Sequence, residues 1–434
     1  MNNSKTGGSA AQDTISASGG EYTDRKSCRS CDSRELEDVL SLGMTYISDF
    51  IPLQAPETGP RSPLELALCQ DCSLLQLRHT ANPDLLWKQY WYRSGTNETM
   101  RAALAEITAQ AEQRVPLQRG DLVLDIGCND GTLLRSYRTN GLQLVGFEPA
   151  GNLLEDARVK TTHIFNDYFN AAAFQADLGT ARARVITSIS MFYDLEDPNA
   201  FVEDIQRCLA PDGLWINQMN YLASMLEQNA FDNIGHEHLE YYSLHSLRKL
   251  FDRHGLTVLD ADLPALNGGS IRLYIGRRAA AGSVPPSAAD RIARLMAQEQ
   301  QLRLTELPVY REFAARVRRT TEQLTEFVKT EAGKGKKVYV YGASTRGSTL
   351  LQYAGLDRRW ISAAAERTPF KWGKKTMGTW IPIISEEQAR RENPEFFLVL
   401  PWFFLEEFRR RESAYLSAGG KFIVPLPQFE ILEH

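Results

Sequence analysis

The chain has 434 residues, of which 43% are hydrophobic and 24% are charged, and its formal net charge is −5. This length favours two or three domains in an ordinary globular protein. The acidic balance argues against a general nucleic-acid binder, and no apolar run approaches the ~18 residues that a membrane span needs.

The N-terminal segment 1–20 is rich in Ser, Gly, Ala and Thr and has no apolar stretch. It is typical of a disordered lead-in rather than of a secretory signal. The chain has six cysteines, too few for a disulfide framework at this length. We therefore expect a soluble cytoplasmic protein, either monomeric or homodimeric.

Four of the cysteines form two pairs, each with the spacing C-x-x-C. They are Cys28, Cys31, Cys69 and Cys72. Four thiolates suit one tetrahedral zinc ion, which would stabilise a small lobe that lacks a large core. The pattern predicts a structural zinc site in a β-rich lobe over residues 21–84; the alternative is a chance spacing of buried or free cysteines.

Residues 90–101 join three adjacent aromatic residues to a polar loop and the start of a helix. Tyr90 and Tyr92 suit a substrate pocket, since tyrosine offers an apolar face and a polar tip. They equally suit a hydrophobic staple that guides the chain into the helix. The periodicity leaves both interpretations open.

Residues 122–134 are typical of a buried strand, a glycine turn and a helix start. Gly127 and Gly131 let the backbone bend sharply and approach a ligand. Asp125, Asn129 and Asp130 place polar groups at this turn. Carboxylates attract the ammonium group of an amino acid and repel a pyrophosphate, so the turn favours S-adenosylmethionine (SAM) over NAD.

Further polar residues follow in the order in which an open α/β sheet would present them. Glu148 ends the next strand about 20 positions after the turn, where an acid can hold both ribose hydroxyls. Asn166 and Asp167 suit an adenine, and Ser190 ends a strand that we expect at the methyl donor. The alternative is an unspecialised βαβ unit with acids placed by chance.

The segment 232–243 holds two of the seven histidines, separated by one glutamate. A metal site at His236 and His238 would lack a third ligand of suitable spacing. A structural loop satisfied by hydrogen bonds is a second possibility. The third, which we favour, is an acid–base pair in which one histidine accepts a proton and Glu237 orients it.

Residues 266–275 predict a glycine turn and a closing strand, with Asn267, Ser270 and Arg272 facing a substrate unless the glycines only form a bulge. After a helical pattern over 288–332, residues 337–349 form a second strand–turn–helix. This turn has no acid and carries Arg346, which suits an anion such as a diphosphate, and Lys371 adds a basic group. The alternative is a Rossmann-like half that only supports the fold.

From about residue 22 to the end, this ordered set resembles the nucleotide-sugar C-methyltransferases that make branched deoxysugars. The resemblance implies an α/β chain with a zinc-binding lobe (21–84) before a central Rossmann-like class I SAM methyltransferase domain (85–282). A helical segment and a C-terminal Rossmann-like domain (283–434) follow. The residues that carry it are the four cysteines, 90–94, 125–131, Glu237 with His238, 267–272 and 341–343.

The resemblance also implies the chemistry: SAM as donor, structural zinc, and a 4-keto hexose on a nucleoside diphosphate as substrate. A base would remove the proton from carbon 3, which the neighbouring ketone makes acidic, and the enolate would accept the methyl group. The resemblance places the base at His238, with Glu237 beside it and His236 less favoured. Tyr90 or Tyr92 would hold the sugar or the developing oxyanion.

Two departures from the resemblance leave the sugar and the methylated atom open. Relatives commonly present a histidine where this chain has residues 191–194, Met-Phe-Tyr-Asp, and Gly235 removes a side chain that relatives use at the pocket. Methylation of oxygen or nitrogen on a related metabolite is therefore an alternative. A zinc-lobed binding protein without turnover is another.

Overall fold

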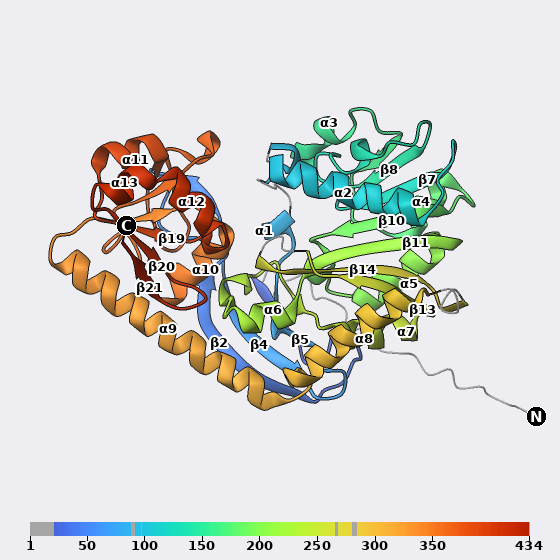
Figure 1. Cartoon of the computed structure of the whole chain (residues 1–434), viewed down its shortest axis with the longest axis horizontal. Helices are drawn as coiled ribbons and strands as arrows, with labels where there is room; N and C mark the ends of the chain where they lie inside the picture. Colours follow the sequence, from blue (N-terminus) through green and yellow to red (C-terminus); the bar gives the residue numbers. More distant parts are fainter. Residues whose placement is uncertain (1–20, 88–91, 97, 265–267, 280–283, 434) are drawn as a thin grey trace, which may run out of the picture.

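The computed structural model describes residues 21–87, 92–96, 98–264, 268–279 and 284–433. Figure 1 shows one large sheet with its helices, a second sheet with its helices at the C-terminal end, and long strands β2 and β4 beside both. None of the helices in these ranges combines the length and the apolar character that crossing a membrane requires. The protein is the α/β structure that the sequence predicts.

The central sheet has seven strands in the order β13-β14-β11-β10-β7-β8-β9. Strand β14 is antiparallel to both of its neighbours, and every other pair is parallel. The order reverses between β7 and β10, and ligands of open α/β sheets bind outside the carboxyl ends of the strands at such a point. The strands are β7 (Leu122–Ile126), β8 (Gln143–Phe147), β9 (His163–Phe165), β10 (Ala183–Ile189), β11 (Leu209–Asn220), β13 (Leu256–Asp262) and β14 (Ser270–Arg277).

Helices cover both faces of this sheet, which is why its inner strands are almost continuously apolar. On one face, α2 (Glu98–Arg114) packs Ile107 into a cluster with Val123. On the other face, α5 (Pro198–Cys208) and α7 (Leu244–Arg253) pack into a cluster that includes Trp215. The shorter helices of this part are α3 (Leu154–Ala157), α4 (Ala171–Leu178) and α6 (Leu222–Glu227). This is the class I SAM methyltransferase fold predicted above.

The N-terminal lobe is a β structure with a four-stranded sheet in the order β12-β5-β4-β2. Its last strand, β12, comes from the histidine segment and pairs antiparallel with β5 through Glu240 and Gln76. The histidine segment is thereby tied to the zinc-binding lobe. The strands are β1 (Tyr22–Asp24), β2 (Leu36–Tyr46), β4 (Arg61–Cys69), β5 (Leu75–Leu77), β6 (His79–Ala81) and β12 (Glu240–Tyr241), and the short helix α1 (Asp84–Trp87) follows.

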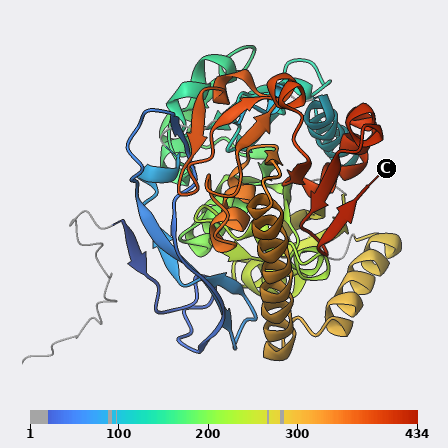
Figure 2. The same ribbon diagram turned by 90° about the vertical axis from the view of Figure 1, so that its left-hand side faces the viewer.

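The C-terminal part begins with α8 (Pro286–Gln301) and the long helix α9 (Leu307–Gly333), as the helical pattern predicts. Figure 2 shows α9 between the N-terminal strands and α8. A six-stranded sheet of order β18-β16-β15-β19-β20-β21 follows. Its elements are β15 (Val338–Tyr341), α10 (Thr345–Tyr353), β16 (Ala363–Glu366), β18 (Ile383–Ser385), α11 (Glu386–Glu392), β19 (Phe396–Val399), α12 (Leu405–Arg411), α13 (Ser413–Ser417), β20 (Lys421–Val424) and β21 (Glu430–Leu432).

The turn after β15 repeats the turn after β7. The carboxylate of Glu366 accepts the backbone N–H of Ala343 at 3.0 Å, as that of Glu148 accepts the N–H of Asn129 at 2.8 Å. Gly342 has a φ of +85° in this second turn, a conformation that glycine adopts without strain. The C-terminal part is therefore Rossmann-like, and β17 (Lys374–Thr376) joins it to the N-terminal lobe by pairing with β3 (Phe50–Pro52).

Candidate functional site

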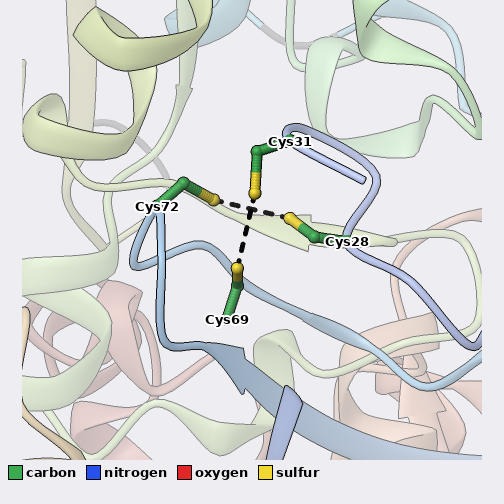
Figure 3. A group of neighbouring side chains, drawn as sticks. All are labelled: Cys28, Cys31, Cys69 and Cys72. Carbon is green, nitrogen blue, oxygen red and sulfur yellow. Dashed lines mark hydrogen bonds between the residues drawn. The ribbon is translucent and has the colours of Figure 1, made fainter. Parts of the chain in front are cut away.

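The four paired cysteines converge on one point in the N-terminal lobe (Figure 3). Their sulfur atoms all lie within 4.8 Å of one another, with 3.4 Å between Cys28 and Cys72 and 3.6 Å between Cys31 and Cys69. Tetrahedral zinc with Zn–S bonds of about 2.3 Å would separate its sulfurs by roughly 3.8 Å. All four thiols are free of disulfides. The residues fit a structural zinc ion.

The glycine turn after β7 lies at the point where the strand order reverses. Gly127 has a φ of +69°, and its N–H donates to the carbonyl of Phe147 at 2.9 Å. A Cβ atom at this position would lie 3.4 Å from Met191, which follows β10. Ser190, directly after β10, lies in the left-handed region with a φ of +56°, and its N–H donates to the carbonyl of Gln218 at 2.8 Å. Two turns thus face each other at the predicted methyl donor.

Glu148 and Asn166 stiffen the neighbouring strand end. The two carboxylate oxygens of Glu148 accept the N–H groups of Asn129 at 2.8 Å and Ala150 at 2.9 Å. Burial raises the pKa of Glu148, although these two bonds oppose the shift. The amide of Asn166 donates to the carbonyl of Glu148 at 2.9 Å, and Asp167 bonds the N–H of its neighbour. These contacts fix the acid that we expect to bind the ribose hydroxyls at the end of β8.

Asn129 and Asp130, the other polar residues of the turn, form hydrogen bonds with residues 92–96, which we call the strap. The side chain of Asn129 accepts the N–H of Ser94 at 3.0 Å and donates to the carbonyl of Tyr92 at 3.0 Å. Asp130 accepts the N–H of Gly95 at 2.7 Å. The strap therefore closes over the SAM turn through the residues predicted to bind the cofactor. Tyr90 lies outside the described residues.

Asp125 lies inside β7 rather than at the rim of the turn. It is 3% exposed, and its Oδ1 accepts the hydroxyl of Thr187 at 2.6 Å. Burial is the main cause that raises the pKa of this carboxyl to about 7, the bond from Thr187 opposes it, and the nearby Glu148 adds to it. The Asp125 carboxyl thus connects β7 to β10 directly before the turn.

The two histidines of the 232–243 segment have different surroundings. The Nδ1 atom of His238 lies 2.6 Å from the carbonyl oxygen of Asn233, and its ring meets Tyr193 edge-on with centroids 4.6 Å apart. A carbonyl oxygen only accepts, so Nδ1 carries a hydrogen and, in the neutral ring, Nε2 has the lone pair. A cavity of about 10 Å³ borders His238, Tyr193 and Glu240, roughly what one water needs.

His236, in contrast, is part of the interior. It is 3% exposed, and its Nε2 lies 3.0 Å from the carbonyl of Ser62 and 3.4 Å from the hydroxyl of Thr45. Burial lowers the pKa of His236, which opposes protonation. Across the described residues, neither His236 nor His238 joins a group of three close potential metal ligands. These contacts make His236 a link to the N-terminal lobe.

Two acids lie around the histidines. The carboxylate of Glu237 folds over Gly235, where a Cβ atom would lie 2.9 Å from Oε2. Asp194 is half-buried, and desolvation of its carboxyl together with Glu237 and Glu240 raises its pKa well above the usual range. Its Oδ1 has no hydrogen-bond partner among the described residues. The segment that departs from the resemblance therefore places an acid of raised pKa beside the loop.

The residues predicted to hold substrate lie in two places. Ser270 and Arg272 are buried on β14, with Arg272 bonded to Gln218 at 2.7 Å and paired with Glu106 at 2.6 Å. In the C-terminal part, Lys371 donates to the carbonyl of Ala343 at 2.8 Å. Asn267 lies outside the described residues.

Arg346 lies in the C-terminal part, on α10, and pairs with Asp232 at 2.9 Å. Asp232, Asn233 and Ser62 were assigned no role from the sequence. No sequence pattern marks a backbone carbonyl as a histidine partner.

Models of three protein families match successive parts of the chain. They are a zinc-binding domain over residues 28–87, a methyltransferase domain over 96–261 and a C-methyltransferase C-terminal domain over 265–427. The chain is also similar to the C-methyltransferase NovU of Streptomyces niveus, with 34% identity over 413 residues. That alignment covers 93% of this chain and 96% of NovU.

More distant similarities cover smaller shares of the chain. The O-methyltransferase resE of Aspergillus sclerotiorum is 25% identical over 130 residues, which cover 28% of this chain and 48% of that protein. A solved structure of the magnesium protoporphyrin IX methyltransferase of Synechocystis PCC 6803 with bound SAM is 14% identical, with a TM-score of 0.31. It covers 41% of this chain and 79% of that chain.

The similarity to NovU covers nearly the full length of both chains. The three matching families, the sheet order and the cysteine cluster point to the same class of enzyme. The protein is an enzyme that uses SAM and holds a structural zinc ion. Its substrate is a small molecule. The chain belongs to the family of zinc-containing, SAM-dependent C-methyltransferases.

Proposed function

We propose that this enzyme methylates carbon 3 of a nucleotide-linked 4-keto deoxysugar, in the biosynthesis of a branched sugar or another secondary metabolite. The observation that carries the proposal is the bond between Nδ1 of His238 and the Asn233 carbonyl at 2.6 Å. It leaves Nε2 of a partly exposed imidazole as a proton acceptor. Removing a proton from carbon requires such a base, and the C–H bonds next to a ketone are the most acidic C–H bonds of a keto sugar.

In the proposed mechanism, Nε2 of His238 takes the proton from carbon 3 and the electron pair moves onto the C4 oxygen. Glu237 stabilises the imidazolium that forms, since a nearby carboxylate favours the charged imidazole. The phenol of Tyr90 or Tyr92 holds the sugar or donates to the C4 oxygen as its charge develops. SAM, when bound, would supply the electrophilic methyl group: the enolate returns to the C4 ketone as C3 bonds to the methyl carbon, and the sulfur–methyl bond breaks to leave S-adenosylhomocysteine. The strap over Asn129 and Asp130 keeps water away from that group.

The substrate residues divide by chemistry. We assign the sugar to Ser270, Arg272 and Asn267 near β14, and the diphosphate to Lys371 and the turn after β15. Lys371 touches the Ala343 carbonyl of that turn, where backbone N–H groups at a helix start favour an anion. The role of Arg346 is treated separately below, because its guanidinium is paired with Asp232.

The proposal is tested by incubating the zinc-loaded enzyme with ¹³C-methyl SAM and a panel of nucleoside-diphosphate 4-keto sugars. Carbon–carbon coupling between the new methyl group and C3 in the product NMR spectrum is the expected result. A methyl group coupled only through oxygen or nitrogen would overturn C-transfer in favour of the related O- or N-transfer. Absence of SAM binding in a titration would instead favour a non-catalytic binding protein.

A further inference from the structure

The segment that carries the base is held by the C-terminal part of the chain. Asp232, which is 2% exposed, forms an ion pair with Arg346 of α10, with N–O distances of 2.9 and 3.1 Å. The indole N–H of Trp402 donates to the same carboxylate at 3.2 Å. The ring of Phe403 lies 4.8 Å from the guanidinium carbon. These contacts keep most water away from the ion pair, and an ion pair that is largely buried is screened less than one on the surface.

A second contact from α10 lies two residues further along. The hydroxyl of Thr349 donates to the carbonyl of Ile234 at 2.8 Å. Arg346 and Thr349 are one helical turn apart, so they reach the loop from the same face of α10. Between their two attachment points lies Asn233, whose carbonyl holds Nδ1 of His238. The C-terminal part therefore fixes the peptide that selects which ring nitrogen of His238 carries the hydrogen.

We propose that Arg346 and Thr349 are positioning residues for the base: they hold the Asn233 carbonyl so that His238 presents its Nε2 lone pair. The inference rests on the proposed function of His238 as the base. Without the two contacts, the carbonyl could turn away and the imidazole would distribute its hydrogen over both nitrogens. Since a displacement of about 1 Å costs roughly 100-fold in rate, the loss would fall on kcat rather than on substrate affinity.

An alternative for Arg346 is direct binding of the substrate diphosphate. The two roles differ in what a variant changes. A lost diphosphate ligand raises KM for the nucleotide sugar, whereas a lost positioning contact lowers kcat and kcat/KM together. The geometry favours positioning, because the Asp232 carboxylate already occupies the guanidinium and a second anion there would meet its negative charge.

The test compares Arg346→Met, Asp232→Asn and Thr349→Val in the full-length, zinc-loaded enzyme. We expect kcat to fall about 100-fold in Arg346→Met with KM for the nucleotide sugar within threefold, and Arg346→Lys to recover most of it. Asp232→Asn keeps the side-chain volume, so it removes the same ion pair and still provides a test if Arg346→Met does not fold. The control is Arg358→Met, which breaks the exposed contact of the C-terminal part with Glu57 (2.8 Å) and should leave kcat unchanged.

Histidine ¹⁵N NMR provides a readout that does not need turnover. In the wild type, His238 should show a protonated Nδ1 and a bare Nε2 in its neutral form, and Arg346→Met should give a mixture of both forms. A tenfold rise in KM with an unchanged His238 spectrum would overturn the proposal and assign Arg346 to the diphosphate. If the wild type methylates no sugar, the proposed function fails, while the NMR comparison still decides whether α10 positions His238.

Discussion

The Nδ1 atom of His238 lies 2.6 Å from the carbonyl oxygen of Asn233. His236, two residues earlier, instead directs Nε2 to the carbonyl of Ser62 at 3.0 Å. His238 therefore leaves Nε2 out of this bond, as the proposed base requires, whereas His236 uses Nε2 to bind the loop to the N-terminal lobe. This difference between two residues of the same type underlies the first prediction.

His238→Gln should abolish exchange of the substrate C3 hydrogen, whereas His236→Gln should retain it with lower stability. Glutamine cannot accept the proton from carbon, but it can still donate to the Ser62 carbonyl. The loss of stability in His236→Gln should be about 1–3 kcal/mol, the cost of an imperfectly satisfied buried group. The measurement is deuterium incorporation from D₂O with S-adenosylhomocysteine bound, beside urea unfolding. Retained exchange in His238→Gln would assign the base elsewhere.

Asp125→Asn should change the dependence of stability on pH. In the folded protein, burial raises the pKa of Asp125 to about 7 from an ordinary value of 3.8. The folded state keeps this proton where the unfolded state has lost it, so the wild type loses stability as pH rises from about 4 to about 7. Asparagine has no proton to lose and can still accept the Thr187 hydroxyl. In chemical unfolding without SAM, the free energy of unfolding of the variant should rise relative to that of the wild type over this pH range, by up to roughly 4 kcal/mol.

Gly95→Ala should weaken SAM binding. A Cβ atom there would lie 2.8 Å from the hydroxyl of Thr132 and 2.9 Å from Asp130, so the strap must move away from the turn. Overpacking of this kind costs about 1–3 kcal/mol, which corresponds to a loss of affinity of roughly 5- to 150-fold. Calorimetric titration with SAM measures it. Gly151→Ala is the matched control, because nothing lies within 4 Å of its Cβ position; equal affinities for both variants would contradict a strap over the cofactor.

Replacement of Cys28 by Ser should remove the zinc and loosen the lobe around it. The zinc content should fall from about one ion per chain to near zero, because three thiolates and a hydroxyl bind zinc far more weakly. Cys208→Ser is the control, since that cysteine is buried in the central part and belongs to no cluster among the described residues. Elemental analysis gives the metal content, and hydrogen exchange should be faster in β4, β5 and β12. An unchanged zinc content would exclude Cys28 as a ligand.

The sequence alone determined the features that depend on short, local patterns. A turn that needs positive φ selects glycine, so Gly127 and the alternation of strands and helices identify the SAM-binding half. Two C-x-x-C pairs predict zinc because ligand geometry restricts the spacing. Even the second Rossmann-like half was visible from the apolar strand and turn at residues 337–347.

Only the tertiary structure decided how the histidine loop is used. His236 takes its partner from Ser62, 174 residues away, and Asp232 takes Arg346 from 114 residues away. Asn129 and Asp130, which suit a cofactor by type, also bind the backbone of the strap, a contact that no sequence pattern indicates. Backbone carbonyls and N–H groups exist at nearly every position, so no residue pattern marks the ones that matter. Folding alone brings them to the side chains that they orient.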